Sequence, residues 1–364
     1  MARVVIATEH LPGRTVRTTE GRELLYFSGT SYLGMSTHPR FLELIAEGLQ
    51  RYGSNFGGSR RSNLQLPIFE EMEQLLANWM LAEAALVLAS GTQAAQLAAR
   101  VARQSASKVF VEPGTHIALS DNWTSEIPFP KQDRTSEIPF PNHKRTSEIP
   151  FSNHDTPPEN TLLLRNSVDP LHCRPTPLPK GYLAHFDRIH LLVDDSHGMG
   201  VTGRYGEGFL GFWRGYPGIS TTGSLGKALA VPAGFIVGSR DFIDACRADP
   251  LFGGSSPPPP AYAYAFVRAR REGLYGEQLG KLRENVAFFW VNAPDLEQYR
   301  TLPYLPIFAT DDTSLANRLL ERDVLISSFR YPTPDDPVIT RMVLSAAHTR
   351  ADVARLCYIL NTYI

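Results

Sequence analysis

The fold is decided by one stretch, IHLLVDDSHG, at residues 189–198. Its first five residues form a largely apolar run, and two acids and a histidine follow at once. Polar groups are costly inside a protein, but they gather at the carboxyl edge of an open parallel sheet, where ligands bind. The stretch therefore predicts an α/β protein with a ligand site just beyond Val193.

Apolar runs alternate with helical patterns on either side of this stretch, which is typical of a mostly parallel sheet covered by helices. The spacing of apolar residues predicts helices over 67–80 and 94–103. Strands are predicted at 84–89, 108–111, 161–165, 189–193 and 234–237.

The pattern changes after the proline run at 257–260. A helical stretch is followed by strands at 304–308, 324–329 and 340–344 and by helices at 314–322 and 350–360. We therefore expect three parts: an N-terminal segment (1–45), a large cofactor-binding domain (46–250) and a smaller α+β C-terminal domain (251–364).

A tandem repeat interrupts the large domain. The heptapeptide TSEIPFP at 124–130 recurs at 135–141 and, with serine for the last proline, at 146–152. Its prolines disfavour both helix and central strand, so we interpret 124–155 as an inserted surface excursion. A tolerated loop expansion is favoured over a peptide-docking role.

Composition excludes several classes of function. The formal net charge is −1 and no block of Lys or Arg occurs, so we expect neither nucleic-acid nor membrane binding. The three cysteines, Cys173, Cys246 and Cys357, lie far apart and form no CxxC pair, which argues against a disulfide framework and a zinc ribbon; we expect no metal site. With no signal peptide or spanning segment predicted, we expect a cytoplasmic protein.

Lys227 and Asp194 together suit pyridoxal 5'-phosphate (PLP). Lys227 lies in TTGSLGKAL (221–229), which we interpret as a loop of small residues. The aldehyde of PLP needs a lysine amine, and its ring nitrogen needs a carboxylate. Alone, Lys227 would be interpreted as a surface residue; Asp194 and the flanking glycines favour the cofactor. The turn SGTQ (90–93), at a predicted helix start, is a plausible phosphate cradle.

One competing motif must be weighed. GMGVTG at 198–203 matches the GxGxxG dinucleotide fingerprint and follows a predicted strand. A dinucleotide loop opens directly into a helix, whereas here a glycine-rich loop continues, so this interpretation is disfavoured.

Five segments resemble the α-oxoamine synthase family of fold-type I PLP enzymes, which includes 8-amino-7-oxononanoate synthase and 2-amino-3-ketobutyrate coenzyme A ligase. In order, they are YFSGTSYLGM (26–35), GSNFGGSR (53–60), VDDSHGMGVTG (193–203), SLGKAL (224–229) and RMVLSAAHT (341–349). The resemblance covers nearly the whole chain.

This resemblance implies roles for individual residues around the cofactor ring. Lys227 would form the Schiff base and then move the substrate Cα proton, and Asp194 would pair with the ring nitrogen. His197 would contact the phenolic oxygen of the ring, Ser167 would lie near that oxygen, and His116 would stack on the ring.

The resemblance also implies how the phosphate and the substrate are held. Gly91, Thr92, Gln93 and Ser224 would bind the phosphate, and Ser256 of a second subunit would complete that site, which implies a homodimer. For the substrate, Arg341 would grip the amino-acid carboxylate, with Thr30 nearby.

The implied reaction condenses an amino acid with an acyl-coenzyme A and releases carbon dioxide to give an α-amino ketone. Departures from the family leave other possibilities open. Thr30-Ser31 stands where the family has an Asn-Asn or Asn-Asp pair, and residues 164–171 retain only part of the family's EGVFSMDGD segment. An aminotransferase or an aldolase-like lyase would use the same Lys227 and Asp194 without coenzyme A. A non-catalytic binding protein that keeps the fold is the third alternative.

Overall fold

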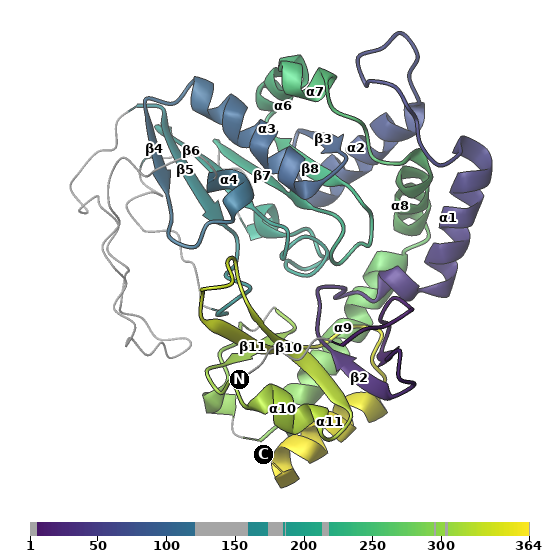
Figure 1. Cartoon of the computed structure of the whole chain (residues 1–364). Helices are drawn as coiled ribbons and strands as arrows, with labels where there is room; N and C mark the ends of the chain where they lie inside the picture. The colour runs from purple at the N-terminus through teal and green to yellow at the C-terminus, as the bar shows by residue number, and fades with distance from the viewer. Residues whose placement is uncertain are drawn as a thin grey trace.

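The computed structural model describes residues 6–120, 159–173, 185, 187–212, 218–294, 296–302 and 305–363. Two sheets organise this part of the chain, the larger in the upper half of Figure 1 and the smaller below it. The predicted insertion at 124–155 lies outside the described residues. Within them, no helix is long and apolar enough to cross a membrane.

The large sheet has six strands in the order β3-β8-β7-β6-β5-β4. Only β8 runs against its neighbours, so the prediction of a mostly parallel sheet is confirmed. The strands are β3 (Ala84–Leu88), β4 (Lys108–Val111), β5 (Thr161–Asn166), β6 (Ile189–Asp194), β7 (Ile219–Ser224) and β8 (Gly234–Gly238).

Both faces of this sheet are buried, which explains why its strands are apolar throughout. On one face, Leu162 and Leu164 pack with α3 (Gly91–Gln104) and α6 (Arg240–Ala248). On the other, Leu163 belongs to the core formed with α2 (Pro67–Met80), α8 (Pro260–Arg271) and the start of α9 (Leu274–Asn292). The side chains thus alternate between two helical layers.

The small sheet has the order β1-β2-β10-β11-β9. Although β1 (Thr15–Arg17) and β2 (Glu23–Phe27) come from the start of the chain, β2 pairs in parallel with β10 (Val324–Arg330). The remaining strands are β9 (Ile307–Thr310) and β11 (Val338–Val343). Residues of α9, α10 (Leu315–Leu320) and α11 (Arg350–Tyr363) share its core, in the lower part of Figure 1.

Two predictions of local structure need correction. The start of the run interpreted as a loop at 221–229 is strand β7, whose small residues are buried between two layers. The strand predicted at 304–308 begins only at Ile307, after Pro306, which cannot donate a ladder hydrogen bond. The remaining elements are η1 (Met35–Thr37), α1 (Pro39–Tyr52), α4 (Ile117–Ser120), η2 (Phe209–Phe212), α7 (Pro250–Gly253) and η3 (Leu296–Gln298).

Candidate functional site

The predicted site residues converge between the two sheets. Asp194 ends β6, Lys227 follows β7, and Arg341 lies on β11 of the small sheet. The charges of Asp194 and Arg341 both act on the pKa of the Lys227 amine, so the three side chains share one electrostatic environment. The fold thus unites residues that are far apart in the sequence.

The environment of Lys227 lowers the pKa of its amine. Burial lowers the pKa of its amine, the Asp194 carboxylate opposes that shift, and the positive charge of Arg341 adds to it. A lysine with a lowered pKa presents more neutral amine near pH 7, which is the form that attacks an aldehyde.

Asp194 is held at the edge of the sheet with one carboxylate oxygen facing His116. Its side chain is only 8% exposed, and Oδ1 accepts a 2.9 Å hydrogen bond from the backbone of Ser196. The other oxygen lies 3.9 Å from Nδ1 of His116. The Asp194 backbone carbonyl accepts a 2.9 Å bond from the amide of Ser167, which brings that predicted residue beside it.

His197 is tied to Tyr32, a residue that the sequence did not single out. The Tyr32 hydroxyl lies 2.7 Å from Nδ1 of His197, and Tyr32 is fully buried. Burial lowers the pKa of His197 well below its usual range, and the positive charges of Lys227 and Arg341 add to that effect. His197 is therefore a neutral imidazole near pH 7, with its ring orientation fixed by Tyr32.

The predicted phosphate cradle has the close backbone approach that an anion site needs. Helix α3 begins at Gly91, and the Ser90 hydroxyl caps it by accepting from the Gln93 amide. A Cβ on Gly91 would lie 2.8 Å from the side chain of Ser224, so only glycine fits between this helix start and the end of β7. Thr92 is exposed at the same end. Free amides at a helix start attract phosphate.

Ser255 and Ser256 differ in their surroundings. The Ser255 hydroxyl accepts a 2.7 Å hydrogen bond from the Gln93 side chain, whereas Ser256 is exposed. The side-chain oxygen of Gln93 is buried without a hydrogen-bond partner in the described part of the chain. Within one chain, Ser255 therefore contacts a predicted phosphate-binding residue, and the role of Ser256 stays a prediction about a second subunit.

The contacts of Arg341 with the described residues leave part of its guanidinium available for a ligand. Its side chain is buried, and Nη1 donates to the carbonyl of Pro170, in the segment that follows β5. The Nε atom is buried with no hydrogen-bond partner among the residues that the structure describes. Thr30 is half-buried, and its neighbour Ser31 accepts a 2.8 Å bond from Ser345, which joins their segment to the one that carries Arg341.

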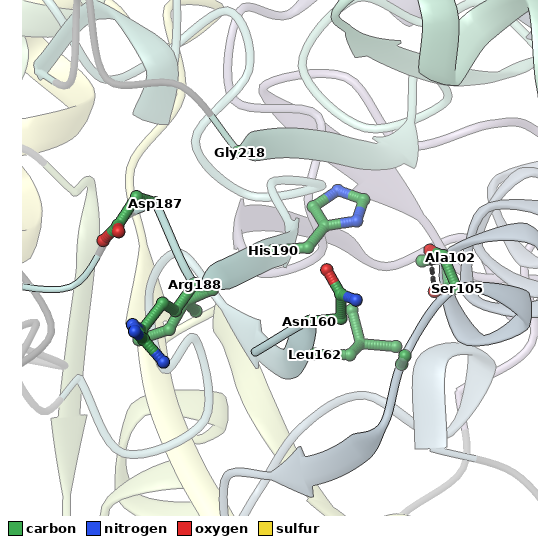
Figure 2. A pocket seen from close by; sticks show the side chains of 10 residues that line it. Ala102, Ser105, Asn160, Leu162, Asp187, Arg188, His190 and Gly218 are labelled. Atoms are coloured by element: carbon green, nitrogen blue, oxygen red, sulfur yellow. Dashed lines mark hydrogen bonds between the residues drawn. The ribbon is translucent and has the colours of Figure 1, made fainter. Parts of the chain in front are cut away.

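A separate cavity of about 220 Å³ lies away from this site. Figure 2 shows its lining, which includes Asn160, Arg188, His190 and Gly218. These residues stand at the starts of β5, β6 and β7, whereas Asp194 and Lys227 follow the ends of their strands. The cavity therefore belongs to the opposite edge of the sheet.

The GMGVTG run at 198–203 does not start a helix. The amide of Gly200 donates to the carbonyl of Gly206, and the amide of Gly208 donates to Thr202, so the run folds into successive turns. The geometry of a dinucleotide loop, in which the last glycine enters a helix, is absent from these residues.

Comparisons with known proteins agree with the motifs. No family model matches the chain. It is similar to the 8-amino-7-oxononanoate synthase of Thioalkalivibrio sulfidiphilus, with 28% identity over 95% of this chain and 89% of the relative. The corresponding synthase of Janthinobacterium sp. is 26% identical, over 93% of this chain and 88% of the relative.

Solved structures share the fold. A serine palmitoyltransferase from S. paucimobilis with a bound PLP–myriocin aldimine has a TM-score of 0.77 at 18% identity, covering 98% of this chain and 91% of that one. An 8-amino-7-oxononanoate synthase from Francisella tularensis has a TM-score of 0.66 at 19% identity, covering 93% and 96%. At these identities the likeness establishes the fold, which is the predicted fold type I.

Proposed function

We propose that this chain belongs to the α-oxoamine synthase family and is a PLP enzyme that joins an amino acid to an acyl group carried by coenzyme A. The observation that carries the proposal is the convergence of Lys227, Asp194 and Arg341 between the two sheets. The names of the relatives support it, because 8-amino-7-oxononanoate synthases align with this chain along almost its whole length.

The described residues offer a partner for the aldehyde, the ring nitrogen and the phosphate of PLP. The buried amine of Lys227 would bond to the aldehyde, and Asp194 would accept a hydrogen bond from the ring nitrogen. The start of α3, pressed against Ser224, would take the phosphate. When bound, PLP supplies an electron sink for the pair of electrons left at the substrate Cα.

The protein's own groups would then orient the substrate and move its proton. Arg341 can grip the amino-acid carboxylate, because its Nε is buried and unpaired within the described residues. Lys227, whose pKa is lowered by burial, can take the Cα proton and return it later. His197, fixed by Tyr32, is placed as a hydrogen-bonding partner for the phenolic oxygen of the ring.

The overall reaction balances without an oxidant or a reductant. A carbon–carbon bond forms between the amino-acid Cα and the acyl carbon, and the thioester C–S bond breaks to release coenzyme A as its thiol. The carboxylate leaves as carbon dioxide, and a proton takes its place at the same carbon. The product is an α-amino ketone.

A homodimer with shared sites is part of the proposal. Ser256 is exposed on the single chain, directly after Ser255, which contacts Gln93. In the proposed dimer, Ser256 would reach the phosphate site of the second subunit. Sedimentation equilibrium should give twice the chain mass of 40.4 kDa; a monomer that holds PLP would contradict this part of the proposal.

The test is amino-acid-dependent thiol release. Purified protein with PLP is incubated with glycine, alanine or serine, with and without an acyl-coenzyme A, and free thiol is measured. We expect release only when both substrates are present, and none with Lys227→Ala. The matched control is Lys281→Ala, because Lys281 is a half-exposed lysine paired with Glu277 on α9. Thiol release that ignores the amino acid would contradict the proposal, and an oxo acid formed without coenzyme A would indicate an aminotransferase.

A further inference from the structure

Asn166, the last residue of β5, holds the loop that carries His116. Its side-chain Oδ1 accepts a 2.9 Å hydrogen bond from the backbone amide of His116. Its Nδ2 donates a 2.8 Å bond to the carbonyl of Gly114. Both ends of one carboxamide are therefore bonded to the same short loop, which fastens that loop to the end of the strand.

The loop itself is a tight turn between β4 and α4. Gly114 has a φ of +84°, a conformation that side chains other than glycine rarely adopt. The Thr115 hydroxyl donates 2.6 Å to the carbonyl of Glu112, which closes the turn on the strand side. At the other end of the turn, the Asn166 carboxamide accepts the hydrogen bond from the His116 amide.

The same residue is in register with Asp194. Asn166 and Asp194 are paired partners in the parallel ladder of β5 and β6. The His116 ring accepts a 3.2 Å bond from the Ala118 amide at Nδ1. That Nδ1 atom is 3.9 Å from the Asp194 carboxylate. Asn166 thus pairs with Asp194 through its backbone and with the loop that carries His116 through its side chain.

We propose that Asn166 is a positioning residue that holds the His116 imidazole beside Asp194, at the proposed cofactor site. The inference rests on the proposed PLP site. The carboxamide contributes no group to the chemistry; it acts by fixing where His116 stands. A displacement of about 1 Å at a reacting group can lower a rate about a hundredfold.

The test compares Asn166→Leu, which removes both bonds at similar size, with Asn166→Asp, which keeps the acceptor for the His116 amide and loses the donor to Gly114. The control is Asn292→Leu, since Asn292 is exposed and its side chain donates to the carbonyl of Phe288 in its own helix, α9. The readouts are the visible absorbance of bound PLP as a function of pH, its dissociation constant and the rate of thiol release.

We expect Asn166→Leu to shift the pH titration of the bound cofactor and to lower thiol release about tenfold or more, with a smaller effect for Asn166→Asp. Combined with His116→Ala, Asn166→Leu should add nothing to the loss caused by His116→Ala alone. An unchanged titration and rate in a folded Asn166→Leu, or losses that multiply in the double variant, would overturn this inference while leaving the PLP site intact. A wild-type protein that binds no PLP would contradict the proposed function itself.

Discussion

Asp194 and Asp195 are neighbours in the sequence, but their carboxylates serve different parts of the fold. Asp194 faces His116 at 3.9 Å, whereas Asp195 is fully buried and accepts a 2.8 Å hydrogen bond from the backbone amide of Phe209. Asp194 therefore lies at the proposed cofactor site, and Asp195 holds the glycine-rich turns that follow His197.

Asp195 should make the stability of the protein depend on pH. Burial raises its pKa from 3.8 to about 7, opposed by a hydrogen bond from Ser167. The folded state thus holds this proton more tightly than the unfolded state. The contribution of this bound proton to the free energy of unfolding is complete below pH 3.8, the ordinary pKa of an aspartate. It is lost as the pH rises to about 7. Urea unfolding of the protein without cofactor should show a decline of a few kcal/mol over this window.

Asp195→Asn should flatten that decline, because an amide does not titrate. Its oxygen can still accept from Phe209, so the variant should fold. The same loss of stability with pH in the variant and the wild type would show that Asp195 is not the group responsible.

Asp194→Asn should lower amino-acid-dependent thiol release about a hundredfold or more, because the amide provides no negative charge for the ring nitrogen. The amide oxygen can keep the bond from Ser196, so the edge of the sheet should stay folded. Asp195→Asn is the matched control and should retain most of the activity. An equal loss of thiol release in Asp194→Asn and Asp195→Asn would contradict the separate role proposed for Asp194.

Tyr32→Phe should affect both stability and the site. Loss of the hydroxyl leaves Nδ1 of His197 without its 2.7 Å partner, which should lower the free energy of unfolding by about 1–3 kcal/mol. The pH titration of bound PLP should shift as well. Tyr275→Phe is the control: Tyr275 is also fully buried, but its hydroxyl donates to Leu229, so only stability should change. A titration that is identical in both variants would exclude a role for Tyr32 at the cofactor.

Arg341→Lys should raise the KM for the amino acid about tenfold or more with a smaller effect on kcat, since an ammonium group cannot form two parallel bonds to a carboxylate. The KM for the acyl-coenzyme A should change little. The exposed Arg17 on β1 provides the control variant, Arg17→Lys. A selective rise in the KM for the acyl-coenzyme A would instead assign Arg341 to the other substrate.

Local patterns predicted much of the fold. Helix α2 occupies the predicted residues 67–80, because an N-terminal proline and a clear apolar stripe define it. Strand β4 likewise matches 108–111. Strand β7 was missed because its Ser, Thr and Gly residues are typical of loops. Its Gly223 is required by packing, since a Cβ there would lie 2.8 Å from the Ser196 backbone.

The motifs also predicted the charged residues of the candidate site, and the structure brings Lys227, Asp194 and Arg341 together. The supporting contacts could not be predicted in the same way. Tyr32 meets His197, and Asn166 meets His116, only because the chain folds back on itself. No periodicity or spacing in the sequence reports such pairings, which depend on strand order and register.

The most direct test of the account is to locate PLP on the chain. The protein is incubated with PLP, reduced with borohydride to make the linkage permanent, digested and examined by mass spectrometry. We predict one cofactor per chain, on the peptide that contains Lys227, and no labelling of that site in Lys227→Ala. Labelling confined to other lysines, or labelling unchanged in Lys227→Ala, would contradict the account.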